Sequence, residues 1–91
     1  MNITFQHKIV IVTGAAHGFG RAIAVAFAAR GGQVWACDIL ADELAETRHQ
    51  CLAAGGWCEV RTVDIADRDA VFAFVAEAQA VSGRVDILVN N

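Results

Sequence analysis

The sequence predicts an α/β fold in which a doubly wound parallel sheet carries helices on both faces. Short apolar runs of strand length alternate with three longer segments whose apolar residues recur at helical spacing. The first run, 9–12, is apolar at every position, as expected for a strand covered on both faces of a parallel sheet. This alternation favours parallel neighbours joined by right-handed crossovers.

Four strands are expected, at 9–12, 33–38, 58–63 and 85–89. Because right-handed crossovers leave few topologies open, we predict the strand order 3-2-1-4. The fourth strand would then lie at an edge of the sheet, although an apolar strand of this kind is normally central and an exposed edge invites pairing with other chains. We therefore expect the sheet to be incomplete on its C-terminal side. Residues 1–91 are interpreted as the N-terminal portion of a single, longer domain that is truncated after Asn91.

Three helices are expected between the strands, after a polar lead-in at 1–7. The first, 19–29, is rich in alanine and ends before a glycine pair. The second, 41–54, begins with acidic residues, and the third, 67–81, has Asp67 as a plausible cap. The apolar positions that helical spacing predicts to face the sheet are Ile23, Phe27, Leu44, Cys51, Leu52, Val71, Phe74, Val75, Ala78 and Val81.

The composition argues against several classes of partner. The chain is 56% hydrophobic and 19% charged, without proline, which is typical of a globular domain rather than a disordered chain. The net charge is −3 and the basic residues are scattered, so neither nucleic acid nor an anionic membrane is an expected partner. The apolar runs are too short to span a bilayer, which needs about 20 residues, and no signal-peptide core is present. We expect a cytoplasmic protein.

The three cysteines are expected to be free, buried thiols. Cys37, Cys51 and Cys58 are odd in number and form no CxxC pair, which argues against a disulfide framework or a structural zinc site. No other metal site is expected. The two tryptophans, Trp35 and Trp57, are interpreted as packing in the core or at the sheet edge.

A glycine-rich turn joins the first strand to the first helix. Gly14, Gly18 and Gly20 allow a sharp reversal and let a ligand approach the backbone closely. The helix that follows directs free amide groups and the positive end of its dipole toward the same place, which favours a pyrophosphate. Glycines alone are a weak signal, because turns and helix ends use them for structural reasons.

Asp38 strengthens this interpretation. It ends the second strand about 20 residues beyond the glycines, as the dinucleotide-binding fingerprint requires. From there its carboxylate can accept hydrogen bonds from both ribose hydroxyls of an adenosine and would repel a 2′-phosphate. The sequence therefore predicts an adenosine dinucleotide site.

Together these residues resemble the first half of a short-chain dehydrogenase/reductase, a family with a Rossmann-type fold. The resemblance rests on the TGxxxGxG pattern over 13–20, on Asp38, on Asp64-Ile65 after the third strand and on the segment 86–91. It implies that Asp64 binds the adenine amino group and that Ile65 packs on the adenine ring. Asn90-Asn91 matches the start of the family's NNAG segment, which lines the adenosine side.

The resemblance also bears on the choice between NAD and NADP. Phe19 replaces the usual isoleucine of the turn, which changes bulk near the pyrophosphate. His17 stands where NADP-preferring relatives often carry arginine or lysine, and histidine, with an ordinary pKa of about 6.5, is mostly neutral near pH 7. Ile39 follows Asp38 where such relatives carry a basic residue. We expect NAD, with NADP less favoured.

We identify no catalytic residue in this chain. The family's Ser and Tyr-x-x-x-Lys are absent, since the chain contains no tyrosine and its one lysine is Lys8. The histidines at 7, 17 and 49 are far apart in the predicted pattern, and none has a nucleophile beside it. The carboxylates at 42, 43 and 46, together with His49, are interpreted as a solvated helix face.

The leading hypothesis is an NAD-dependent oxidoreductase to which this chain contributes the cofactor site. The resemblance implies hydride transfer between nicotinamide and a secondary alcohol or the matching ketone, with sugars and sugar acids among the candidates. It also implies a homo-oligomer, a tetramer or dimer. Two alternatives stay open: a non-catalytic dinucleotide sensor or interaction module, and a methyltransferase that uses S-adenosylmethionine, which the TGxxxGxG spacing disfavours.

Overall fold

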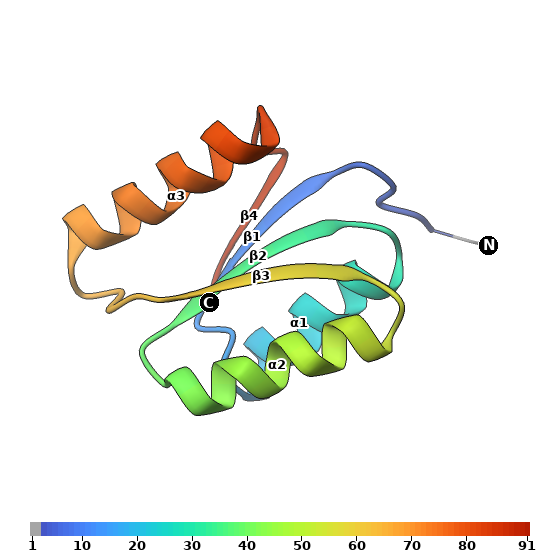
Figure 1. The fold of residues 1–91 in the computed structure, drawn as a ribbon, viewed down its shortest axis with the longest axis horizontal. Helices are drawn as coiled ribbons and strands as arrows, with labels where there is room; N and C mark the ends of the chain where they lie inside the picture. Colours follow the sequence, from blue (N-terminus) through green and yellow to red (C-terminus); the bar gives the residue numbers. More distant parts are fainter. Residues whose placement is uncertain (1–2) are drawn as a thin grey trace.

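The computed structural model describes residues 3–91, which form a four-stranded parallel sheet with helices on both faces (Figure 1). Residues 1–2 of the predicted lead-in lie outside the described residues. Along the chain, the elements are β1 (Ile9–Thr13), α1 (Gly18–Ala29), β2 (Gln33–Asp38), α2 (Ala41–Ala53), β3 (Trp57–Thr62), α3 (Arg68–Ser82) and β4 (Ile87–Asn90).

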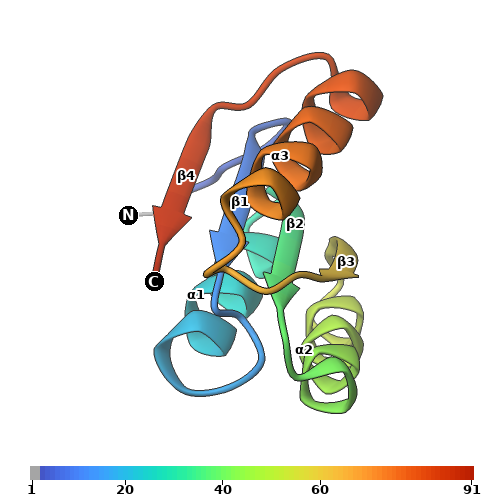
Figure 2. The same ribbon diagram turned by 90° about the vertical axis from the view of Figure 1, so that its left-hand side faces the viewer.

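The strands lie in the order β3-β2-β1-β4, which confirms the predicted topology (Figure 2). All three neighbouring pairs are parallel, and Val10 of β1 aligns with Val34 of β2 and Ile87 of β4. β4 begins two residues later than predicted. Asp86 still donates its N–H to Ile9 O (2.9 Å), so the chain joins β1 just before the strand begins.

The sheet separates two hydrophobic cores because successive side chains of a strand point to opposite faces. Val10 and Val12 of β1 belong to the core that α1 and α2 cover, whereas Ile9 and Ile11 belong to the core under α3. Figure 1 shows α1 and α2 on one side of the sheet and α3 on the other. β1 therefore lies fully buried, as its uniformly apolar sequence predicts.

Most of the predicted inward-facing helix positions are buried or half-buried, but Leu52 and Val81 are wrong. Leu52 is 43% exposed, because Cys51 is the residue that returns over Leu44 and the next residue is rotated by about 100°. Val81 is 67% exposed. The last turn of α3 presents Ser82 to the sheet instead, where its hydroxyl accepts a hydrogen bond from Trp35 Nε1 (3.1 Å).

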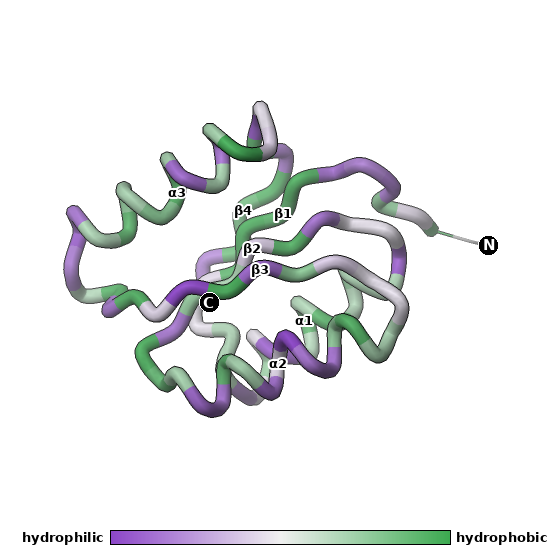
Figure 3. The backbone as a smooth tube through the Cα atoms, viewed as in Figure 1, coloured by the Kyte–Doolittle hydropathy of each residue, from purple (hydrophilic) through white to green (hydrophobic). Residues whose placement is uncertain are grey.

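Figure 3 shows apolar residues concentrated on the central strands and hydrophilic residues recurring along α2. Trp35 is buried in the core, and Trp57 is half-exposed at the outer strand β3, in agreement with the sequence interpretation. Asp67 caps α3 as predicted, since its side chain accepts a hydrogen bond from Ala70 N–H (3.1 Å). No helix within residues 3–91 has the length and apolar character needed to cross a bilayer.

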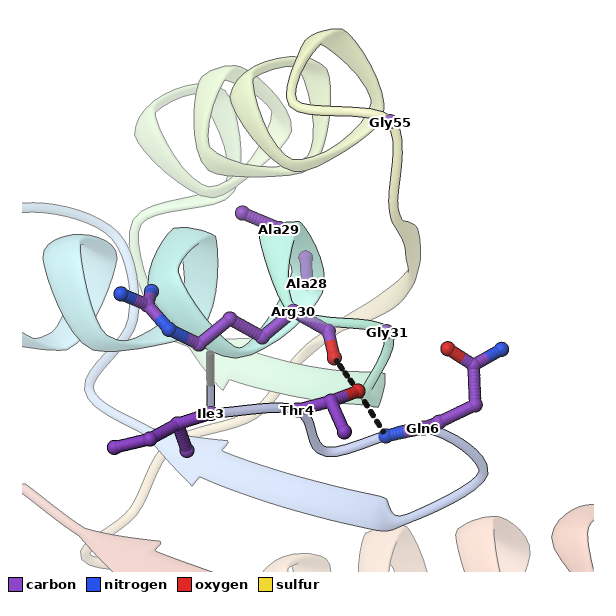
Figure 4. A pocket seen from close by; sticks show the side chains of 8 residues that line it. All are labelled: Ile3, Thr4, Gln6, Ala28, Ala29, Arg30, Gly31 and Gly55. Atoms are coloured by element: carbon purple, nitrogen blue, oxygen red, sulfur yellow. Dashed lines mark hydrogen bonds between the residues drawn. The ribbon is translucent and has the colours of Figure 1, made fainter. Parts of the chain in front are cut away.

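The residues before β1 fold back onto the C-terminal end of α1. Phe5 N–H and Thr4 Oγ1 both donate to Arg30 O, at 2.8 and 3.1 Å. The Phe5 ring also packs edge-on against Phe27, with centroids 4.7 Å apart. A hollow at this end is lined by Ile3, Thr4, Gln6, Ala28, Ala29, Arg30, Gly31 and Gly55 (Figure 4). It lies where β2 begins, away from the residues predicted to bind a cofactor.

Asp86 fixes the start of β4 to the start of β1. Its Oδ2 accepts hydrogen bonds from Ile9 N–H (2.8 Å) and from Arg84 Nε (2.9 Å). The Ile9 N–H, followed by the Arg84 guanidinium, holds the pKa of Asp86 below its usual value. A depressed pKa in the folded state means that the ionised carboxylate stabilises the fold above the ordinary aspartate pKa of about 3.9, and that this stabilisation is lost as the pH falls through the folded-state value.

We therefore expect Asp86→Asn to lower the free energy of unfolding at neutral pH. The difference from wild type should be constant from about pH 7 to pH 5 and should shrink below about pH 4. Urea unfolding followed by circular dichroism over this range measures it. Asp69→Asn, at an exposed position in the first turn of α3, is the matched control. A difference that persists undiminished at pH 2 would contradict the assignment.

Candidate functional site at the carboxyl edge of the sheet

The residues that the sequence singles out gather where the parallel strands end. Five of them, Gly14, Asp38, Ile39, Asp64 and Ile65, line one small pocket. They come from the segments that follow β1, β2 and β3, and the carboxyl ends of parallel strands meet at the same edge of a sheet. The structure thus brings together residues that are up to 51 positions apart, as counted from 14 to 65.

The glycine-rich turn needs glycine at all three positions, for two different reasons. Gly14 and Gly18 have φ angles of +64° and +59°, in the left-handed region that side chains disfavour. Gly20 is helical, but a Cβ placed there would lie 1.9 Å from the carbonyl oxygen of Gly14. The turn therefore allows α1 to begin in direct contact with the end of β1.

The N-terminus of α1 is open toward the site. His17 is the N-cap, in extended conformation, and its side chain makes no capping hydrogen bond. Helical geometry leaves the N–H groups of Gly18, Phe19 and Gly20 without an acceptor inside the helix. A Cβ on Gly18 would meet no atom within 4 Å, and Phe19 is 83% exposed. Free amides and a positive dipole end thus face open space, an arrangement that suits a bound anion.

The carboxylate of Asp38 is held by two backbone groups. Oδ2 accepts a hydrogen bond from Ala16 N–H (3.0 Å) in the glycine-rich turn, and Oδ1 accepts one from Leu40 N–H (3.1 Å). Each carboxylate oxygen has a second acceptor position. The group is therefore fixed in orientation and can still receive two further donors.

Burial makes the neighbouring thiol of Cys37 unreactive. Desolvation, together with the charge of the adjacent Asp38, raises the pKa of Cys37 to about 11. The thiolate is the nucleophilic form of cysteine. Cys37 thus remains a neutral packing residue at physiological pH, as expected for a buried free thiol.

The end of β4 supports the turn from its other side. The Thr13 hydroxyl donates to Asn90 Oδ1 (3.0 Å) and accepts from Asn91 N–H (3.2 Å). Asn91 Nδ2 donates to Gly14 O (3.1 Å). Thr13 therefore connects β1 to the end of β4.

The loop after β3 forms the outer wall of the pocket. Asp64 Oδ1 accepts a hydrogen bond from Ala66 N–H (2.9 Å), which fixes the turn before α3. Ile65 is 51% exposed although it is apolar. It also borders a second pocket, whose other lining residues are Thr13, Arg68, Val71, Phe72 and Asn90. An exposed isoleucine at this place offers an apolar surface beside the pocket.

His17 lies beside the acidic start of α2. Its Nε2 is 3.9 Å from Glu43 Oε2, and both side chains are more than half exposed. The two residues border a shallow pocket together with Arg21, Asp42 and Glu46. As interpreted from the sequence, the three carboxylates of α2 face solvent, but Glu43 also places negative charge next to the turn.

Two residues of this region were missed at the sequence level, Arg21 and Thr47. Arg21 Nε donates to Thr47 Oγ1 (2.9 Å), and the Thr47 hydroxyl donates to Ala15 O (2.7 Å). Thr47 is fully buried, although α2 is otherwise largely polar. One signal was present: Thr47 falls on the stripe of Leu44 and Cys51, at helical spacing, and a buried hydroxyl needs a partner.

Comparison with known proteins agrees with this arrangement. A sequence model of the short chain dehydrogenase family matches residues 8–91. The 3beta-hydroxysteroid dehydrogenase of Mediterraneibacter gnavus is 39% identical over 87 residues, covering 96% of this chain and 32% of that protein. This chain spans about a third of the length of the curated relatives that it matches first.

Solved structures agree as well. A short chain dehydrogenase from Mycobacterium paratuberculosis bound to NAD superposes with a TM-score of 0.90 at 33% identity, over 98% of this chain and 38% of that one. A metagenomic short-chain oxidoreductase in complex with NADP gives a TM-score of 0.90 at 35% identity, over 94% of this chain and 39% of that one. The family match extends from the first residues of the sheet through the glycine-rich turn to the end of β4. The chain belongs to the short-chain dehydrogenase family.

Proposed function

We propose that this chain is the cofactor-binding portion of an NAD-dependent oxidoreductase. One observation carries the proposal: Gly14, Asp38, Ile39, Asp64 and Ile65 line a single pocket beside the uncapped N-terminus of α1. Such a pocket offers backbone amides for a pyrophosphate, a fixed carboxylate for a ribose and an apolar surface for a base. The three parts of an adenosine diphosphate have matching partners there.

Each part of the cofactor has a proposed partner. The free N–H groups at Gly18, Phe19 and Gly20 bind the pyrophosphate, and the open space over Gly18 leaves room for it. The Asp38 carboxylate receives the ribose hydroxyls on the acceptor positions that the backbone leaves free. In this proposal Asp64 binds the adenine amino group and Ile65 packs on the ring. Asn90 and Asn91 line the adenosine side while holding the turn.

The reaction proposed for the full-length protein is hydride transfer between the nicotinamide and a secondary alcohol or the matching ketone. The nicotinamide, when bound, supplies the hydride acceptor or donor. The residues of this chain orient the adenosine half and keep the pyrophosphate at the helix N-terminus. The chain contains no tyrosine, so we propose that the serine, tyrosine and lysine of the family lie outside residues 1–91, in the same domain.

We propose NAD rather than NADP on electrostatic grounds. The Asp38 carboxylate lines the pocket, and the carboxylate of Glu43 lies 3.9 Å from the His17 imidazole at the edge of the turn. Ile39 brings no positive charge to the pocket. A 2′-phosphate would add about two negative charges beside these groups. Similar structures are solved with either cofactor, so the preference rests on these residues.

The remaining proposals concern the whole protein. We propose a homo-oligomer, a tetramer or dimer, which light scattering coupled to size exclusion tests. Sugars and sugar acids are candidate substrates, and a screen of secondary alcohols with NAD tests them. The free thiols of Cys37, Cys51 and Cys58 agree with a reducing, cytoplasmic location.

Two alternative functions predict different measurements. A non-catalytic sensor or interaction module would bind NADH without turning over any secondary alcohol. A methyltransferase would bind S-adenosylmethionine in preference to NAD. The glycine spacing of the turn and the Asn90-Asn91 pair, whose second member donates to Gly14 O, disfavour the methyltransferase.

Replacing Asp38 by alanine should weaken NADH binding to the full-length protein by about 10- to 100-fold. The expected loss is that of one net charge-assisted hydrogen bond to the ribose, which contributes about 1.5–3 kcal/mol. Isothermal titration calorimetry measures the change in Kd. Asp69→Ala, which removes an exposed carboxylate on α3, serves as the control and should bind NADH like wild type. Unchanged NADH binding by Asp38→Ala would overturn the ribose assignment.

The double substitution Asp38→Ser with Ile39→Arg should shift the preference toward NADP. It removes one repelling carboxylate and adds a guanidinium, which binds phosphate through a bidentate fork. We expect the ratio of NADPH to NADH affinity to rise at least about tenfold, as one charge-assisted contact would give. Competition between the two nucleotides in a fluorescence titration reports it. Ile39→Gln with Asp38→Ser is the matched control: it should show only the part of the rise that comes from losing the Asp38 carboxylate, and an equal rise there would contradict the contribution of the guanidinium.

A further inference from the structure

Arg21 is held on the inner side of the glycine-rich turn by three acceptors. Its Nε donates to Thr47 Oγ1 (2.9 Å), and its Nη2 donates to Ala16 O and to Glu43 O, the latter at 2.8 Å. The guanidinium therefore joins α1, the turn and the first turn of α2. Its Nη2 is engaged by two backbone carbonyl oxygens and its Nε by the Thr47 hydroxyl, so this edge of the guanidinium faces the turn.

Thr47 passes this interaction on to the peptide between Ala15 and Ala16. Its hydroxyl is fully buried, accepts from Arg21 and donates to Ala15 O at 2.7 Å. The same hydroxyl lies farther from two other carbonyl oxygens, at 3.3 Å from Ala16 O and 3.4 Å from Glu43 O. Since a hydroxyl carries one proton, the shortest contact defines its main acceptor.

The peptide group that accepts the hydrogen bond from Thr47 is the same one that donates a hydrogen bond to Asp38. Ala15 O and Ala16 N–H belong to the same peptide group, and Ala16 N–H donates to Asp38 Oδ2 (3.0 Å). The hydrogen bonds run in one direction: the guanidinium donates to the hydroxyl, the hydroxyl donates to the peptide, and the peptide donates to the carboxylate. Hydrogen bonds that are aligned in series polarise one another, and each strengthens the next in a site of low dielectric.

We propose that Arg21 and Thr47 are positioning residues that orient the Asp38 carboxylate for the ribose of the cofactor. The inference rests on the proposed function, because Asp38 is there the ribose acceptor. Beyond that function, the inference is that the orientation of the Asp38 carboxylate does not depend on the loop after β2 alone. A positive charge on the far side of the turn holds it through the buried threonine and one peptide group.

The alternative is that Arg21 and Thr47 only hold α1 against α2. Both roles predict a loss of stability when the hydroxyl is removed, so stability cannot separate them. They differ in two other respects. A positioning role requires that removing the Thr47 hydroxyl change the protection of the Ala16 amide. It also requires that the effect of this change on cofactor binding depend on the presence of Asp38.

The first test measures the amide directly, without any ligand. Thr47→Val keeps the shape of the side chain and removes the hydroxyl, whereas Thr47→Ser keeps the hydroxyl. In the full-length protein, hydrogen exchange of the Ala16 amide, measured relative to that of the Trp35 amide in the centre of β2, should become roughly tenfold faster in Thr47→Val and stay near wild type in Thr47→Ser, on the scale of one lost hydrogen bond. Equal protection of Ala16 in all three proteins would overturn the proposal.

The second test is a double-mutant cycle on NADH binding, measured by calorimetry. Thr47→Val should weaken binding roughly five- to twentyfold when Asp38 is present and should have little effect in the Asp38→Ala background. Thr47→Ser should restore wild-type binding. Arg21→Lys keeps the charge but loses the planar fork of the guanidinium. It should therefore also weaken NADH binding when Asp38 is present and have little effect in the Asp38→Ala background.

The outcomes separate the inference from the function on which it depends. Equal losses in both backgrounds would make the pair merely structural and would overturn the inference alone. Wild-type protein that binds no NADH would overturn the proposed function and the inference with it. The positioning role is supported if Thr47→Val weakens NADH binding only in the protein that keeps Asp38 and also speeds hydrogen exchange of the Ala16 amide.

Discussion

The carbonyl oxygen of Gly14 lies so near the Cα of Gly20 that no side chain fits between them. This contact determines where α1 begins and how closely it packs against the end of β1. Because α1 starts there, its first amides face the edge of the sheet at which all four strands end. The small residues Ala24 and Ala28 then let the helix lie close on the sheet, where both are fully buried. A single missing Cβ thus couples the packing of the first crossover to the placement of free backbone donors.

The glycine-rich turn is held by polar contacts from several separate elements. β4 holds the turn through Thr13 and Asn91, and α2 holds it through Thr47. No buried side-chain nitrogen or oxygen among the described residues lacks a hydrogen-bond partner. Since unpaired buried polar groups are costly, this complete pairing gives the turn one defined conformation. Rigidity at a binding site reduces the entropy lost when a ligand binds.

The fold, and the edge of the sheet at which the candidate residues meet, could be predicted from the sequence because the signals are local and repeated. The uniformly apolar β1, the glycine punctuation and the strand-end Asp38 each act within a few residues of where they occur. Leu52 and Val81 were misassigned because helical spacing identifies the face of a helix that packs on the sheet. It does not show which residues at the edge of that face, or at the end of the helix, are still covered by the sheet. Arg21 and Thr47 were missed because their roles depend on a contact between two helices, made by residues that are 26 positions apart in sequence. A threonine on an apolar stripe is a sign that such a contact exists, but it does not name the partner.

The way Asp38 is held has a consequence for sequence divergence. Both hydrogen bonds to its carboxylate within residues 3–91 are donated by main-chain amides, those of Ala16 and Leu40, and every residue except proline carries such an amide. The side chains at 39 and 40 point outward, with Ile39 58% and Leu40 43% exposed. Exposed substitutions usually change stability by less than about 0.5 kcal/mol. Within a lineage, residues at these two positions can therefore be exchanged at little cost to the fold, so the rim of the pocket is free to vary while the acid beneath it keeps its geometry.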